Sequence, residues 1–534
     1  MNDSNRGRKT GSVALVGAGP GDPGLLTLRG KELLEQADVV VYDRLAHPAL
    51  LQYAPNAEHL YVGKSSSRHT MPQMEISRLL VDRALTGQRV VRLKGGDSFV
   101  FGRGGEELEA CVEAGIPFEV VPGITSAIAA PAYAGIPVSH RHYASAIAII
   151  TGHRRDEADT TTGEEHAGEK SQPAALMPPV YNPAAPWTLI YLMGVENLPQ
   201  IIECVKTAGY PVQTPAALIQ WGTRPNQRVV AGPLDRIQEI AQEGGIQSPA
   251  ITVIGEVVQL RQTLRWFDNR PLFGKRILVT RAREQASELS VRLRLLGAEP
   301  IEYPMIKIQP LQSDGLLDSA LKRLKDTDWV IFTSANGVRA VANRMMELKL
   351  DARIFGSCKI AAIGPATDEA LHTVGLWADF VPSRFVAESL LEELPEHCLT
   401  NRRILIVRAK EARDVLPDGL AAKGAQVEVI PAYETVPDAE GASELINEIL
   451  NGQMDVITFA SSSTVRNLAA ALAPKPMSDL AGKVVVASIG PVTSKTATEL
   501  GLPPDIEAPV HTIPGLVEAI LSFYSERKAE KGRP

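Results

Sequence analysis

The residues best suited to chemistry lie in one glycine-rich stretch, VRLKGGDSFVFGRGGEE, at positions 91–107. Gly95 and Gly96 have no Cβ, so a ligand can approach the main chain closely and a positive φ is allowed. Asp97 can accept hydrogen bonds from hydroxyl or amino groups. The pattern predicts a loop that binds a small ligand. A strand-to-helix turn without any ligand is the alternative for Gly-Gly-Asp taken alone.

The elements that must position this loop follow an alternating α/β pattern. A buried strand is expected at 12–16, then a glycine turn at 17–22, a helix over 25–34 and a strand at 39–43. A second strand-rich half is expected to contain strands at 146–153, 188–194, 216–224 and 250–258. The polar segment 154–186 is expected to be a surface loop or a partly disordered insertion.

The first glycine turn resembles a dinucleotide-binding fingerprint, and Asp43 stands where that fold places its ribose acid. The fingerprint G-x-G-x-x-G, however, requires glycine at position 22, which is Asp22. Pro20 also lacks the amide that would face a pyrophosphate. The sequence therefore disfavours a dinucleotide-dependent reductase.

Composition sets the broad class. The 534 residues should form three to five folding units, and 44% hydrophobic with 22% charged residues is ordinary for a globular protein. A net charge of −7 argues against nucleic acid as a partner. Four cysteines without C-x-x-C favour a reduced, cytoplasmic setting over disulfides or a zinc knuckle. The polar residues 1–11 and the lack of an 18-residue apolar run predict no membrane partner.

The carboxyl-terminal half repeats itself. The stretch 333–339, TSANGVR, is similar to FASSSTVR at 459–466, and AIGPAT at 362–367 is similar to SIGPVT at 488–493. Each follows an expected strand, so the pattern predicts two doubly wound, flavodoxin-like domains with ligands beyond the carboxyl ends of their strands. Residues 261–274 have no strand or helix period, and 266–273 are expected to be a linker, with a new domain from 274.

Residues 12–265 resemble uroporphyrinogen-III C-methyltransferase. The resemblance rests on GAGPGDPGLLTLRG, YDRL, VGK, RLKGGDSFVFGRGGEE, VVPGITSAIAAPAYAGIPVSHR, LMG and SPAITVIGEVV, in that order. It implies a two-lobed tetrapyrrole methylase, with lobes at about 12–125 and 126–265, that binds S-adenosyl-L-methionine and releases S-adenosyl-L-homocysteine. The cofactor positions carried over are Pro20, Gly95, Gly96, Asp97, Val100, Thr125, Ser126, Met193 and Gly222.

The same resemblance implies that two ring carbons of uroporphyrinogen III are methylated to give precorrin-2, for sirohaem or cobalamin. It makes Asp43 the proton acceptor and Lys64 the donor, although a salt-bridged or strand-capping Asp43 is an equal alternative. Candidate cations for the substrate carboxylates are Arg44, Arg103, Arg141, Arg224 and Arg228. His140 and His142 lack further ligands at metal-like spacing, so no metal is expected. With about eleven residues before the first strand, no dehydrogenase and ferrochelatase module is expected.

Residues 274–534 resemble uroporphyrinogen-III synthase, mainly in element order and duplication. The resemblance implies that 275–308 join 433–534 in one domain, which encloses a second domain at 310–431. Tyr433, in PAYETV, would assist loss of the hydroxyl from hydroxymethylbilane. Thr367 and Thr512 match cleft threonines. Ser334, Ser461, Ser462 and Ser463 are suited to carboxylates or, equally, to capping helices. Arg281, Arg283, Arg408, Lys410 and Arg413 could add positive field.

Together the two resemblances predict an enzyme that first cyclises hydroxymethylbilane to uroporphyrinogen III, with inversion of ring D, and then methylates it twice. A homodimer through the methyltransferase half is expected from the resemblance alone. The alternative is a methyltransferase of another precorrin fused to a non-catalytic tetrapyrrole-binding module.

Overall fold

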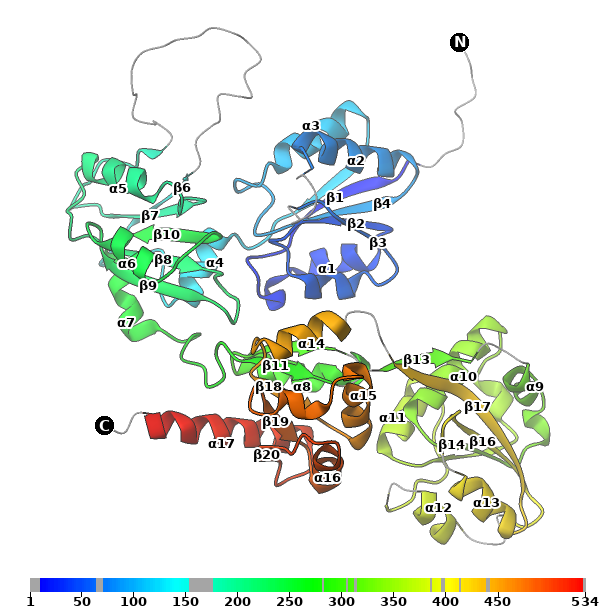
Figure 1. The fold of residues 1–534 in the computed structure, drawn as a ribbon. Coiled ribbons are helices and arrows are strands. Elements are labelled where there is room, and N and C mark those ends of the chain that lie inside the picture. The colour runs from blue at the N-terminus through cyan, green and yellow to red at the C-terminus, as the bar shows by residue number, and fades with distance from the viewer. Residues whose placement is uncertain are drawn as a thin grey trace, which may run out of the picture. The chain divides into compact units, whose positions relative to one another are not determined.

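The computed structural model describes residues 10–63, 71–152, 176–280, 283–303, 306–311, 315–384, 387–394, 399–412, 414–437 and 442–531. The chain divides into two compact units (Figure 1). The first contains Met1–Arg276 with Arg292–Glu299 and Tyr524–Pro534, and the second contains Ile277–Val291 and Pro300–Phe523. No helix among the described residues combines the length and apolar character needed to cross a bilayer.

The first lobe is a parallel sheet with helices on both faces. Its strands are β1 (Ser12–Gly17), β2 (Val39–Tyr42), β3 (Glu58–Tyr61), β4 (Arg89–Lys94) and β5 (Phe118–Val121), in the order β3-β2-β4-β1-β5. Helices α2 (Gln73–Leu85) and α3 (Gly104–Glu113) cover one face, and α1 (Leu28–Glu35) covers the other (Figure 1). The strands are apolar along their length because both faces are covered.

The expected helix over 25–34 begins three residues later, at Leu28. The Thr27 hydroxyl accepts a hydrogen bond from the amide of Gly30 at 3.1 Å, which makes Thr27 the N-cap. The preceding residues form a short 3-10 turn, η1 (Pro23–Leu25), in which Asp22 accepts from Gly24. Asp22 is therefore the N-cap of this turn, at the end of the glycine turn 17–22.

The second lobe has a mixed sheet. Its strands are β6 (Ala146–Thr151), β7 (Trp187–Leu192), β8 (Pro215–Gln220), β9 (Arg228–Pro233) and β10 (Ala250–Ile254), in the order β6-β7-β10-β8-β9. Only β6 and β7 are parallel neighbours. Helices α5 (Leu198–Thr207) and α6 (Ile237–Glu243) pack on one face, and α4 (Ser126–Tyr133) packs on the other. Most of the polar segment 154–186 lies outside the described residues, but Leu176 is buried in this core.

After β10, the chain forms η5 (Glu256–Leu260) and a short helix α7 (Arg261–Leu264). The expected strand at 250–258 therefore stops at Ile254, and a helical turn occupies part of the segment 261–274 in which the sequence showed no period. Gly255 at φ 144° makes this change of direction, which a side chain would strain.

The carboxyl-terminal half contains two five-stranded sheets. The first has the order β12-β11-β18-β19-β20 and the second β13-β17-β16-β14-β15. The strands are β11 (Arg276–Val279), β12 (Glu299–Glu302), β13 (Ile306–Pro310), β14 (Trp329–Phe332), β15 (Lys359–Ala362), β16 (Arg403–Ala409), β17 (Gln426–Pro437), β18 (Val456–Phe459), β19 (Val485–Ser488) and β20 (Ile506–Glu507). The helices are α8 (Arg283–Leu295), α9 (Leu316–Lys322), α10 (Ala335–Glu347), α11 (Pro365–Thr373), α12 (Ala387–Glu393), α13 (Val415–Ala422), α14 (Ala442–Leu450), α15 (Ser462–Leu472), α16 (Pro491–Glu499) and α17 (Ile513–Lys531).

The two repeats occupy equivalent places in these sheets. Ser334 caps α10 after β14, and Ser461 caps α15 after β18, each accepting from the amide three residues on. Strand β17 extends to Pro437, because its end pairs antiparallel with β13 after its start has paired parallel with β16. These two long-range strands carry the chain out of one sheet and back.

Three loops at the carboxyl ends of β1, β4 and β5 meet through glycines. A Cβ on Gly17 would stand 2.4 Å from Cα of Gly123, and a Cβ on Gly123 would stand 2.2 Å from the carbonyl oxygen of Gly96. Asp97 holds the loops after β4 and β5 together, because its carboxylate accepts hydrogen bonds from the amides of Phe99 at 2.8 Å and Gly123 at 2.9 Å. No side chain fits at this crossing.

We expect Gly123→Ala to lower the free energy of unfolding by more than about 2 kcal/mol, because the added methyl group meets main chain that cannot move aside. Gly105→Ala is the matched control: its Cβ would have nothing within 4 Å, so it should leave stability unchanged or raise it slightly. Thermal unfolding of both full-length variants measures the difference. Equal melting temperatures would contradict the steric account.

Candidate functional site

A cavity of about 610 Å³ opens between the two lobes of the first unit. The first lobe contributes the loops that follow β1, β2 and β4, and the second contributes those that follow β7 and β8, with the start of α4 between them. The residues singled out from the sequence that line it are Pro20, Asp43, Arg44, Gly95, Gly96, Ser126, Met193, Gly222 and Arg224. Residues distant in sequence thus converge on one site.

The backbone around this cavity is unusual on both sides. Gly96 has φ 70°, and Gly95 could not carry a Cβ, which would stand 2.4 Å from Cβ of Leu45. On the other lobe, Met193 at φ 56° and Trp221 at φ 49° are non-glycine residues held in the left-handed region. Such strained positions persist only where surrounding contacts enforce them, and they often mark ligand sites.

Three expected cofactor residues support the wall without lining it. The carboxylate of Asp97 accepts hydrogen bonds from the backbone amides of Phe99 and Gly123, as described above. Thr125 caps α4, with its hydroxyl 3.3 Å from the amide of Ala127. Val100 packs against the core cluster that contains Ala127. Gly222 lines the cavity, but a Cβ there would stand 2.2 Å from Cβ of Ala130, so helix packing alone already requires glycine.

Asp43 is joined to a buried group of charges. Its carboxylate lies 3.2 Å from Arg92 and accepts from the amide of Leu45 at 3.0 Å. Arg92 and Lys94 both reach the fully buried Glu107, at 3.2 and 2.9 Å. Two cations and two carboxylates therefore alternate, so each buried charge has an opposite neighbour. Burial, and then Arg92, lower the pKa of Lys94.

Asp43 is salt-bridged, as one of its two alternatives expects, and it also lines the cavity, which is where a proton acceptor would have to lie. Lys64, the expected donor, lies outside the described residues.

Two of the expected arginines frame the cavity around Trp221. The guanidinium of Arg224 lies 4.7 Å from the ring centroid and donates to the carbonyl of Leu45 at 3.1 Å, and Arg44 lies 5.7 Å from the same ring. Burial lowers the pKa of Arg224. An arginine on an aromatic face keeps a donor edge available for a carboxylate.

The other expected arginines do not line the cavity. Arg103 pairs with Glu106 at 2.7 Å, and Arg228 donates to the carbonyl of Gly244 at 2.6 Å. Arg141 is exposed in the turn before β6. For Arg228 the contact is structural, because it closes the loop after α6. Nothing in the sequence distinguished it from Arg224.

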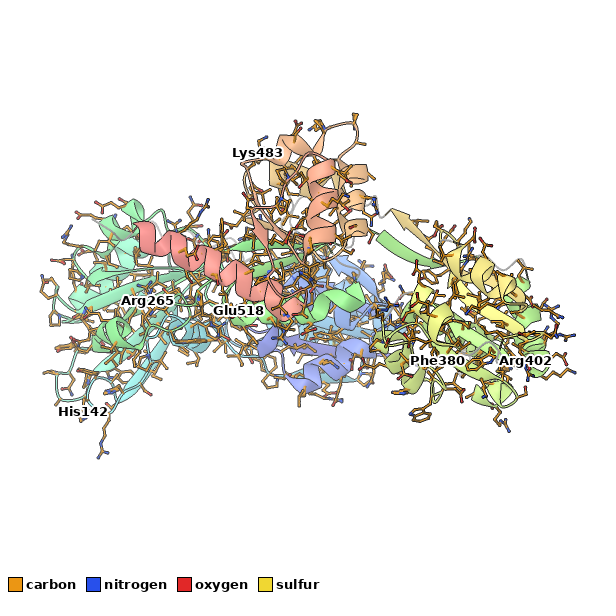
Figure 2. All side chains as sticks on the ribbon, turned by 90° about the horizontal axis from the view of Figure 1, so that it is seen from below. His142, Arg265, Phe380, Arg402, Lys483 and Glu518 are labelled. Atoms are coloured by element: carbon orange, nitrogen blue, oxygen red, sulfur yellow. The ribbon has the colours of Figure 1, made fainter. Side chains whose placement is uncertain are left out.

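The histidine pair has a local role. His140 accepts at Nδ1 from the amide of His142 at 3.2 Å, and the two rings lie 5.6 Å apart. His142 lies at the outer surface of the second lobe (Figure 2). Within the described part of the chain, no three His, Cys, Asp or Glu residues are grouped to hold a metal ion.

A second cavity, of about 410 Å³, lies at the carboxyl ends of β14, β16 and β17. Tyr433 lines it, and its hydroxyl lies 2.9 Å from that of Ser334. Arg408 also lines it and pairs with Asp414 at 2.7 Å. Lys410 pairs with Glu434 at 3.0 Å instead. A phenol, a hydroxyl and a guanidinium thus share one pocket.

The remaining residues expected in this half mostly stabilise helix starts. Ser461 caps α15, and its hydroxyl lies 2.8 Å from that of Ser463. Ser462 donates to Val492 at 3.1 Å, and Thr512 accepts from Gly515 at 3.2 Å. Thr367 is buried in the first turn of α11, in the other sheet's domain. Arg281, Arg413 and the side chain of Arg283 lie outside the described residues.

Known families match both halves of the chain. Residues 12–238 match the family model of tetrapyrrole (corrin/porphyrin) methylases, and residues 287–518 match that of uroporphyrinogen-III synthase HemD. Two families of tetrapyrrole enzyme are thus matched by separate parts of one chain.

The whole chain also has a relative of the same extent. It is 39% identical over 514 residues to the porphyrin biosynthesis protein HemD of Ruminiclostridium josui, covering 96% of this chain and 98% of that protein. The chain belongs to the family of this protein.

Two further likenesses each cover one part. The uroporphyrinogen-III C-methyltransferase of Bacillus subtilis is 43% identical over 346 residues, which is 65% of this chain and 68% of that protein. A crystal structure of uroporphyrin-III-C-methyltransferase from Thermus thermophilus is 38% identical, with a TM-score of 0.39, covering 49% of this chain and 99% of that one.

A histidine with a shifted pKa lies two residues beyond Leu45, which lines the cavity. His47 follows the loop of Asp43 and Arg44, and its Nδ1 accepts from the amide of Ala49 at 3.1 Å, which requires an unprotonated Nδ1. Burial, and then the guanidinium of Arg224, lower the pKa of His47 to about 4.

In the unfolded chain this pKa is about 6.5, so the unfolded state binds more protons between pH 6.5 and 4. The contribution of neutral His47 is fully present above that window and is lost as the pH falls through it. His47→Asn keeps a capping acceptor and does not titrate. Between pH 7 and 5, we expect the free energy of unfolding of the variant to fall by up to about 2 kcal/mol less than that of the wild type. Urea unfolding at both pH values measures this, and identical losses would contradict it.

Proposed function

We propose that this chain catalyses two successive steps of tetrapyrrole biosynthesis. Its carboxyl-terminal half, residues 274–534, closes hydroxymethylbilane to uroporphyrinogen III with inversion of ring D. Its amino-terminal half, residues 12–265, then transfers two methyl groups to give precorrin-2, on the way to sirohaem or cobalamin. The observation that carries the proposal is the match of both family models to separate halves of one chain, each with its own cavity.

The cavity between the lobes suits S-adenosyl-L-methionine, which supplies an electrophilic methyl group when it is bound. Leu192, Met193 and Ile219 offer apolar contact, and Gly95 and Gly96 expose main chain for hydrogen bonds. The protein's own part is to align the methyl group with a ring carbon that is already nucleophilic. We propose S-adenosyl-L-homocysteine as the released product.

We propose that Asp43 accepts the proton that leaves the methylated ring carbon. Its exposed side faces the cavity, while Arg92 and the amide of Leu45 fix the other side. The proposal for Lys64 as donor rests on the family resemblance alone. Arg44 and Arg224 are placed to bind substrate carboxylates, because both guanidinium groups line the cavity beside Trp221.

In the synthase half, we propose that the Tyr433 hydroxyl protonates the hydroxyl group that leaves hydroxymethylbilane. Ser334 holds this phenol at 2.9 Å and thereby sets its direction. Arg408 lines the same pocket and adds positive charge for the substrate carboxylates. Thr367, Thr512, Ser461 and Ser462 remain candidates for substrate contact.

Two further proposals follow from the family resemblance. The methyltransferase half is proposed to pair into a homodimer, and the enzyme is proposed to act in the cytoplasm. The free thiols of Cys111 and Cys358 are consistent with a reducing compartment.

The proposal is tested by incubating the full-length protein with hydroxymethylbilane and identifying the tetrapyrrole. We expect uroporphyrinogen III without S-adenosyl-L-methionine and the dimethylated product with it. Formation of only the uninverted isomer I, which arises spontaneously, would contradict the synthase assignment. Failure to methylate supplied uroporphyrinogen III would contradict the methyltransferase assignment.

We expect Tyr433→Phe to slow cyclisation about 100-fold, because a general acid contributes at least about that factor. Methylation of supplied uroporphyrinogen III should remain at the wild-type rate. Tyr303→Phe, in the same half, is the matched control and should change neither rate. Equal loss of both activities in Tyr433→Phe would instead indicate general damage to the protein.

A further inference from the structure

The segment that follows α7 packs tightly on the end of α4. The indole Nε1 of Trp266 donates to the carbonyl of Ala132 at 2.9 Å, and Phe267 is only 3% exposed. Both rings meet the ring of Tyr133 edge to face, with centroids 5.0 and 4.8 Å away. The guanidinium of Arg270 covers both rings, at 4.8 and 5.0 Å. Residues expected to be a bare linker thus form a wall behind Tyr133.

Ion pairs hold this wall in place. Arg261 pairs with Asp268 and donates to the carbonyl of Ala134, and Arg265 pairs with Asp268 at 3.0 Å. Arg265 lies on the second lobe, as does His142 (Figure 2). A Cβ on Gly135 would stand 2.6 Å from the carbonyl oxygen of Leu264, so the two backbones are in contact. The wall covers one side of the Tyr133 ring, and the hydroxyl at the end of the ring reaches Asp22.

On its open side, Tyr133 belongs to a ring of hydrogen bonds that joins the two lobes. Its hydroxyl donates to the carboxylate of Asp22 at 2.8 Å, and the amide of Asp22 donates to the hydroxyl of Thr223 at 3.0 Å. The amide of Thr223 donates to the side chain of Gln227 at 2.9 Å. Gln227 donates back to the carbonyl of Tyr133 at 3.4 Å. Four residues from three segments close the ring.

This ring adjoins the cavity between the lobes. Pro20 lies two residues before Asp22, and Gly222 immediately precedes Thr223, so one ring bond ties together loops on opposite sides of the cavity. Thr223 is 2% exposed and has φ 72°, a strained value for a β-branched residue. The hydrogen bonds from Asp22 to the Thr223 hydroxyl and from the Thr223 amide to Gln227 are the local contacts that can hold Thr223 at this φ.

We propose that Tyr133 is a positioning residue for S-adenosyl-L-methionine: backed by Trp266 and Phe267, its hydroxyl holds Asp22 and so sets the separation of Pro20 and Gly222 across the cofactor cavity. The inference rests on the proposed cofactor site. Burial, and then Asp22, raise the pKa of Tyr133, so the phenol stays a neutral donor at physiological pH.

The hydroxyl and the ring of Tyr133 have separable roles. The aromatic ring fills space against Trp266 and Phe267, which stabilises the fold whether or not a cofactor binds. The hydroxyl donates to Asp22, and a hydrogen bond to a charged group is strong enough to fix a loop. Tyr133→Phe removes the hydroxyl and retains the ring.

We expect full-length Tyr133→Phe to bind S-adenosylhomocysteine about tenfold more weakly by calorimetry, as loss of a charge-assisted hydrogen bond implies. KM for S-adenosylmethionine should rise by a similar factor, while kcat at saturating cofactor stays within about twofold of the wild type. Tyr181→Phe is the matched control in the second lobe and should leave both constants unchanged. Unchanged affinity in Tyr133→Phe would overturn the proposal.

The opposite side of the ring supplies a second, independent pair of variants. Thr223→Val removes the hydroxyl that accepts from Asp22, whereas Thr223→Ser retains it. We expect Thr223→Val to weaken binding of S-adenosylhomocysteine about as much as Tyr133→Phe, and Thr223→Ser to restore it. Equal affinities for the two Thr223 variants would overturn the proposal even if Tyr133→Phe fails to fold. If the wild type itself does not bind S-adenosylhomocysteine, the proposed cofactor site is wrong, which is a different result.

Discussion

The amino-terminal half depends on a place where main chain meets main chain with no side chain between. The loops that follow β1, β4 and β5 cross at Gly17, Gly96 and Gly123, and the carboxylate of Asp97 ties the crossing together. The position of this crossing sets the positions of the first-lobe residues that line the cavity. Pro20 lies three residues beyond Gly17, and α4 begins three residues beyond Gly123. A binding site on loops needs such a rigid origin.

The second constraint is electrostatic and concerns the charged side chains around Asp43. Asp43 can face the cavity as a carboxylate because Arg92 neutralises it from inside the lobe, and Glu107 in turn neutralises Arg92 and Lys94. Removing one member would leave a buried charge without its opposite, which costs far more than the pair contributes. Their function is therefore better described as holding Asp43 in a fixed direction than as adding stability.

The sequence predicted the central strands well and missed most of those at the sheet edges, although it identified the edge strand β6. Central strands such as β1 and β14 are covered on both faces and appear as continuous apolar runs. The strands it did not identify, β3, β5, β9, β12, β13 and β20, all stand at sheet edges. There one side is open to solvent, so a segment such as EHLY in β3 carries no buried run. Likewise, residue types identified the cavity loops but could not tell Asp97, a loop tether, from a ligand contact.

The segment after the last strand shows why a lack of period is a poor sign of a linker. The run from Trp266 to Arg270 packs as aromatic rings capped by a guanidinium, an arrangement that follows neither helical nor strand spacing. Because Phe267 is buried against Tyr133, the methyltransferase unit must extend past residue 266. A cut at that point would expose the ring whose hydroxyl joins the two lobes, and the compact unit continues to Arg276.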